Sequence, residues 1–178
     1  MNCADKPPER YEEWLACLQA LHEHPWEARL LCERMRRGVF QGASSSLLPS
    51  FQRRVLECVN RMLDQAVAHF SHQCQEILET ADFSMLDLLF QHLAAQIRQA
   101  LFFCELGFLP EEFRRSTELS LRERMTVFWN GTLRTLQGEA MENGALELED
   151  ALWAIRRIRL FPAPAEEGAL SAGPAPAS

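Results

Sequence analysis

The sequence lacks the patterns of a β-sheet, a membrane span and a nucleotide-binding loop. Val, Ile and Thr are sparse among its 178 residues, and apolar and polar residues never alternate for long, so we expect no strands. No uninterrupted apolar run approaches the roughly 20 residues that span a bilayer. Neither a G-x-x-x-x-G-K-S/T loop nor a G-x-G-x-x-G turn occurs, which argues against nucleotide chemistry.

Cysteine-pair motifs are absent too, although the chain has six cysteines. No two of them form a C-x-x-C pair, and the first residues, MNCADKPPERYEE, carry no apolar stretch of the kind that a secretory signal needs. We therefore expect an intracellular protein, cytoplasmic or nuclear or both. Its thiols should be reduced, and several should serve as small apolar core residues.

Positive charge is scarce. The formal net charge is −7, and the 18 basic residues include a single lysine, Lys6. A uniformly basic nucleic-acid binder is therefore not expected, although arginines that are grouped locally could still bind phosphate. Apolar residues make up 47% of the chain, which is enough for the core of one domain, and the 24% of charged residues argues against wholesale disorder.

Helical spacing of apolar residues is the dominant positive signal. Apolar residues recur three and four positions apart in segments that are separated by Pro, Gly or Ser. We predict an all-α fold: a single antiparallel helical bundle of about five to seven helices over 9–161, with a flexible N-terminus at 1–8. The Pro/Ala/Gly-rich tail 162–178 has no periodic pattern and should be disordered.

Two parts are expected within the bundle. Residues 9–38 should form a helical hairpin that Gly38 ends. Residues 39–49, rich in Gly and Ser, read as a loop, and 50–161 as the main bundle. The hairpin could pack on the main bundle or swing away from it on this loop.

The segment 84–107 should be the central helix, because it has no fully polar face. Ser84 and Asp87 have the spacing of a capping box at its start. Apolar residues alternate four and three apart along one seam, and others lie on the opposite side, as in a helix with neighbours all round. The seam residues are Leu86, Phe90, Leu93, Ile97, Ala100 and Cys104.

Helices with one apolar face are expected on either side of this segment in sequence. A long one should run over 49–80, capped by Ser46 or Ser50. Another should begin at Pro110 and end at Asn143-Gly144.

Glycines inside the helix that begins at Pro110 predict an irregularity. Gly131 and Gly138 each weaken it, which suggests a kink or a close helix crossing there. The i, i+4 pairs Glu111–Arg115 and Glu118–Arg122 should support its exposed face.

The best candidate for a metal site is a set of side chains on the predicted helix 49–80. His69, His72 and Glu76 stand at i, i+3 and i+7, so they could share one edge of the helix, and His92 on the next helix could complete a set. Such residues also border buried faces in many helices, and no Glu-x-x-His partner of the di-iron kind is present. We therefore expect no metal, no cofactor and no enzymatic activity; a metal-dependent enzyme remains the least favoured alternative.

Two arginine clusters close predicted helices. One consists of Arg34, Arg36 and Arg37, and the other of Arg156, Arg157 and Arg159 beside Trp153. Arginine at a helix C-terminus stabilises the helix dipole without any partner. Arginine beside tryptophan is also typical of protein interfaces, and arginine clusters bind the phosphates of RNA or anionic lipid. All three interpretations stay open at this point.

Protein binding is the function that these features favour. Four tryptophans and eleven phenylalanines supply more apolar surface than a small bundle need bury, and exposed apolar patches usually mark interaction surfaces. We predict a non-enzymatic helical adaptor or subunit of an intracellular multiprotein complex. The alternative is a peripheral binder of anionic lipid or nucleic acid that uses the arginine clusters. The predicted partner-binding residues, on a last helix over 146–160, are Leu152, Trp153, Arg156, Arg157 and Arg159.

Overall fold

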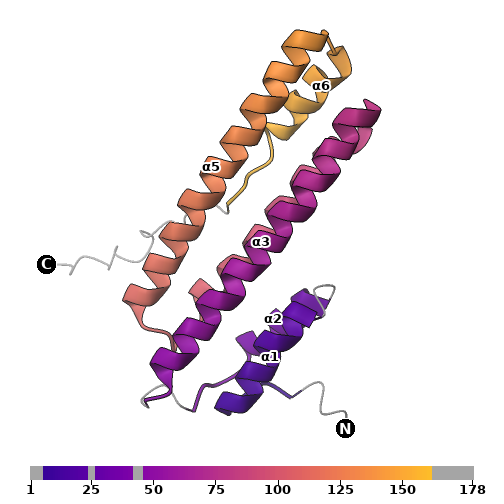
Figure 1. Ribbon diagram of the computed structural model, residues 1–178. Helices are drawn as coiled ribbons and strands as arrows, with labels where there is room; N and C mark the ends of the chain where they lie inside the picture. Colours follow the sequence, from indigo (N-terminus) through magenta and orange to yellow (C-terminus); the bar gives the residue numbers. More distant parts are fainter. Residues whose placement is uncertain (1–5, 24–26, 42–45, 162–178) are drawn as a thin grey trace, which may run out of the picture.

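The computed structural model describes residues 6–23, 27–41 and 46–161, and throughout these ranges the regular structure is helical. No strand occurs in them, so the predicted all-α fold is confirmed, with six α-helices against the expected five to seven (Figure 1). The predicted tail 162–178 lies outside the described residues. The helices are α1 (Tyr11–Glu23), α2 (Ala28–Arg36), α3 (Leu48–Thr80), α4 (Leu86–Leu101), α5 (Glu111–Asn143) and α6 (Leu146–Ile155), and 3-10 turns occur at Phe83–Met85 and Phe102–Glu105.

The two longest helices, α3 and α5, run side by side along the molecule (Figure 1). Asp64 on α3 forms an ion pair with Arg124 on α5, and the rings of Phe70 and Phe128 meet edge to face between the same helices. The helices α1 and α2 pack together beside α3 and α4, whereas α6 folds back against α5 and α4. The far end of α5 and the short α6 therefore form one tip of the molecule (Figure 1).

Helix α4 is the centre of the bundle, but the predicted second apolar side is not covered throughout, because Leu88 is 49% exposed. The helix contacts α2, α3, α5 and α6, and the predicted seam residues from Leu86 to Ala100 are all buried. Phe90 on α4 packs edge to face against Phe70 on α3 and against Trp129 on α5, with ring centroids 4.9 and 4.7 Å apart. One helix thus ties both long helices into a single core.

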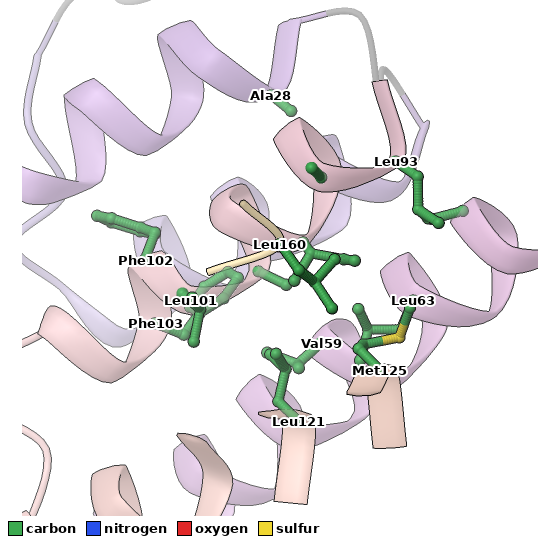
Figure 2. Packing of buried hydrophobic residues seen from close by; sticks show 14 of the residues in the cluster. Ala28, Val59, Leu63, Leu93, Leu101, Phe102, Phe103, Leu121, Met125 and Leu160 are labelled. Carbon is green, nitrogen blue, oxygen red and sulfur yellow. The ribbon is translucent and has the colours of Figure 1, made fainter. Parts of the chain in front are cut away.

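Leu160 closes the core from the C-terminal side. The chain leaves α6 after Ile155, and Leu160 is buried in the same core cluster as Val59, Leu63 and Leu101 (Figure 2). The predicted last helix over 146–160 is therefore five residues too long. Helical spacing does continue beyond Ile155. Burying the Leu160 side chain in the core, however, stabilises the fold more than extending the helix along the surface would.

The predicted cap of the long helix is wrong. Leu47 occupies the N-cap position of α3 and makes no side-chain cap, while Ser46 lies in the turn before it. The hydroxyl of Ser50 instead lies 3.2 Å from the hydroxyl of Tyr11, which joins α3 to α1. Pro49 in the first turn has no amide hydrogen, so fewer donors need a cap at this helix start.

The predicted capping box at the start of α4 is also wrong. Asp82 accepts hydrogen bonds from the backbone N–H and the hydroxyl of Ser84, at 3.2 and 2.6 Å, and so draws Ser84 into the 3-10 turn Phe83–Met85. Asp87 accepts a hydrogen bond from the N–H of Leu88 and not from Ser84. An aspartate side chain can accept a hydrogen bond from the backbone N–H two residues later, and this local turn forms without a helix.

Helix α5 begins and ends where the sequence predicts. It follows Pro110 and ends at Gly144, which adopts a left-handed conformation with φ 60°. The predicted pairs Glu111–Arg115 and Glu118–Arg122 both form, the first exposed and the second half-buried.

The predicted close helix crossing at the α5 glycines is wrong. A Cβ atom added at Gly131 or Gly138 would meet nothing within 4 Å, and α5 continues through both positions. Both glycines face open space.

Candidate protein-binding surface

Trp153 is the most exposed Trp, Phe or Tyr side chain among the described residues. Helix α6 buries Leu148, Leu152 and Ile155, which recur four and three positions apart and face the core. Trp153 directly follows Leu152 in sequence and so lies outside this buried stripe. Its side chain is 61% exposed. A tryptophan side chain that is largely exposed to solvent is uncommon and often marks an interaction surface.

A hollow of about 350 Å³ lies beside Trp153, between the ends of α5 and α6. Met141, 82% exposed, stands on its α5 side. We call Gln137, Met141, Trp153, Arg156 and Arg157 the tip surface.

Two members of the tip surface could not be found from the sequence. Met141 and Gln137 lie on α5, and their position beside Trp153 depends on where α6 folds back. The only sequence signal is that Met141 directly follows Ala140, which continues the apolar seam four positions after Leu136, so Met141 departs from that seam.

Arg156 and Arg157, which directly follow α6, lie beside Trp153 and have no acidic partner in the described ranges. The guanidinium carbon of Arg157 is 4.3 Å from the centre of the Trp153 ring, within the range of a cation–π interaction. Within the described ranges, Arg156 and Arg159 form no ion pair and no side-chain hydrogen bond, and both are exposed. Their charges are available to a binding partner.

The five predicted partner-binding residues therefore have different positions. Trp153, Arg156 and Arg157 are exposed together, and Arg159 is exposed further along the chain. Leu152 is only 5% exposed and forms the floor of the hollow.

Phe161 does not extend the exposed apolar surface. It is half-buried, and the guanidinium carbon of Arg122 lies 4.8 Å from the centre of its ring.

The first arginine cluster is largely engaged within the molecule. Arg36 forms a 2.9 Å ion pair with Glu105 and lies over the ring of Phe102, so it joins α2 to the chain that follows α4. Arg34 donates a hydrogen bond to the backbone carbonyl of Lys6. These contacts give the cluster a structural role.

The candidate metal ligands lie along the outer edge of α3 and α4. The rings of His69 and His92 are 6.2 Å apart, edge to face, and both side chains are exposed. His72 and Glu76 are exposed on the following turns of α3. Over the described ranges, no three His, Cys, Asp or Glu side chains are grouped so as to hold a metal ion.

The thiols are poor nucleophiles where they are described. Burial raises the pKa of Cys32 to about 12 and that of Cys58 to about 11, so neither is a thiolate near neutral pH. Cys17 and Cys74 are buried as well, and Cys104 is half-buried. All five are unpaired.

Two other hollows formed by the described residues have no exposed Trp, Phe or Tyr side chain in their lining. One of about 320 Å³ lies between α1 and α3 over the buried Leu18 and Cys58, with Arg54 and Arg61 at its rim. Another, of about 590 Å³, lies between the end of α3 and the start of α4 and contains the exposed Met85.

Two further findings bear on the function. Of the helices in the described ranges, none combines the length and the hydrophobicity that crossing a membrane requires. Comparisons of the chain with protein-family models, with curated proteins and with solved structures give no match. The interpretation of the tip surface therefore rests on its own geometry and chemistry.

Proposed function

We propose that this chain is a non-enzymatic helical adaptor or subunit of an intracellular protein complex, which binds its protein partner at the tip surface. The observation that carries the proposal is the exposure of Trp153 beside Met141 at the rim of a hollow. A tryptophan that is buried on binding removes a large apolar area from water, and tryptophan and arginine are the residues most enriched among binding hot spots.

The charges around the hollow support a protein partner over a phosphate surface. Arg156 lines the hollow together with Glu149, and Asp150 is exposed three positions before Trp153. These carboxylates would repel the phosphates of RNA or of an anionic membrane, whereas a protein can present both signs of charge. The unpaired thiols in the described ranges fit an intracellular, reducing compartment.

The test is a comparative purification of the tagged full chain from the cells that express it. Wild type, Trp153→Ala and the control Leu119→Ala are compared, with proteins quantified by mass spectrometry. Leu119 is 69% exposed on α5, so the control removes a similarly exposed apolar side chain elsewhere. We expect a near-stoichiometric protein, which could be an untagged copy of the chain, that is lost with Trp153→Ala and retained with Leu119→Ala. A set of recovered proteins that is unchanged by Trp153→Ala would overturn the proposal.

A further inference from the structure

The exposed side of α6 carries a symmetric charge pattern. Glu149 and Asp150 stand four and three positions before Trp153, and Arg156 and Arg157 stand three and four positions after it. All five side chains are exposed; Glu149, Asp150 and Trp153 share one face of α6, and Arg156 and Arg157 lie in the turn that directly follows it, with Arg157 over the Trp153 ring. Along the helix axis, this side of the chain therefore carries two acidic residues, then Trp153, then two basic residues.

We propose that the tip surface, together with the adjacent Glu149 and Asp150, binds the same surface of a second copy of this chain, with the two α6 helices antiparallel. A two-fold axis near Trp153 brings Glu149 and Asp150 of each copy opposite Arg156 and Arg157 of the other. The same patch then serves both subunits, which is the condition for a closed dimer. This inference rests on the proposed function, since it names the occupant of the tip surface.

The charge order selects this occupant over others. A parallel arrangement would place acid against acid and base against base, which costs binding energy. A uniformly acidic partner would match the arginines but face Glu149 and Asp150 on the preceding turn. Acids before and bases after a helix also stabilise its dipole, but that effect gives no reason for an exposed Trp153 between them.

The neighbouring hollow is where Trp153 of the second copy would bind. Met141 and Gln137 line it from α5, and Leu152 forms its floor. In the antiparallel arrangement, Trp153 of each copy approaches Met141 and Leu152 in the hollow of the other. The tip surface has far fewer residues than the roughly 20–30 that a standard interface uses on each side. We therefore expect a weak, reversible dimer.

The test uses charge reversal in the purified full chain, followed by sedimentation equilibrium from about 1 to about 500 μM. One variant carries Glu149→Arg and Asp150→Arg, so its face is basic on both sides of Trp153. The other carries Arg156→Glu and Arg157→Glu, so its face is acidic on both sides. The control, Glu111→Arg with Glu112→Arg, reverses two exposed acids in the first turn of another helix, α5.

We expect the wild type and the control to dimerise alike, each reversed variant alone to dimerise at least about tenfold more weakly, and a one-to-one mixture of the two to recover the wild-type affinity. Circular dichroism is used to check that each variant is folded. Recovery in the mixture separates pairing across an interface from stabilisation within α6, because a dipole effect stays within each chain. A monomeric wild type, dimers that ignore the reversals, or a mixture without recovery would each overturn the inference. If another protein still requires Trp153 in the purification above, the proposed function stands while this inference falls.

Discussion

The guanidinium of Arg157 lies over the ring of Trp153, with its carbon 4.3 Å from the ring centre. The two residues are four positions apart across the end of α6, so the contact is set by local geometry and does not need a partner. It covers one face of the indole and restricts its rotation. Trp153 is still 61% exposed and lines the same hollow as Met141; if it binds a partner as proposed, this contact lowers the cost of ordering its side chain.

Removing Trp153 and Arg156 together should abolish partner binding and leave folding intact. Both side chains are exposed, and Arg156 has no ion-pair partner in the described ranges, so Trp153→Ala with Arg156→Ala should change the free energy of unfolding by less than about 0.5 kcal/mol. Thermal melting and quantitative pull-down measure the two effects. Undiminished recovery of the partner by the folded double variant would show that the binding surface lies elsewhere.

Replacing Ile97 by Asp should unfold the domain. Ile97 is 0% exposed on the central helix α4, where a carboxylate would have neither water nor a counter-charge. We expect a loss of more than about 4 kcal/mol, measured by chemical denaturation or as the absence of a cooperative thermal transition. Leu88→Asp, at an exposed position of the same helix, is the control and should melt close to wild type. A melting temperature of Ile97→Asp near that of wild type would mean that the core is misplaced.

Two glycines should respond to alanine in opposite directions. A Cβ atom at Gly38 would lie 2.6 Å from the carbonyl oxygen of Pro8 and 2.8 Å from Cζ2 of Trp14, which is fully buried. Gly38→Ala should therefore destabilise the protein by about 1–3 kcal/mol. Gly131→Ala adds a Cβ in open space inside α5 and should stabilise it by about 0.5–1 kcal/mol. Urea denaturation of both variants measures the signs, and equal effects would contradict the close packing of Gly38.

Stability should fall above about pH 9 because of the buried thiols. Burial raises the pKa of Cys32 from 9.0 to about 12, so the folded chain holds this proton more tightly than the unfolded chain does. The stabilisation is complete below pH 9 and is lost as the pH rises towards 12, by up to about 1.4 kcal/mol per pH unit. Between about pH 8 and pH 10, Cys32→Ala should lose about 1 kcal/mol less than wild type in denaturant titrations. Parallel losses would show that Cys32 is not buried as a thiol.

The central helix could be predicted because its signal is local and redundant. Residues such as Phe90 and Ile97 repeat with a helical period, and few charges interrupt either side, so the burial of α4 follows from its own sequence. The ends of elements could not be predicted equally well. Asp82 competes for the amide of Ser84 at shorter range than a capping box requires, and Leu160 enters a core that distant residues build.

The tip surface could be predicted only in part for the same reason. Trp153, Arg156 and Arg157 lie within one turn of each other, so their proximity follows from the sequence of α6. Met141 joins them because Gly144 reverses the chain and brings α6 back against the end of α5. The exposure of a side chain depends on such tertiary contacts, and helical spacing alone does not determine it.

Photo-crosslinking from position 153 tests the central claim most directly. A benzoylphenylalanine in place of Trp153 keeps an aromatic side chain at the tip surface and reacts only with groups within a few ångströms. The same probe in place of Leu119, on the exposed side of α5, is the control. We expect irradiation to link position 153, and not position 119, to one protein, either a second copy of the chain or a different partner, in near-stoichiometric yield. Equal crosslinking from both positions, or none from position 153, would contradict the assignment of the tip surface as the binding site.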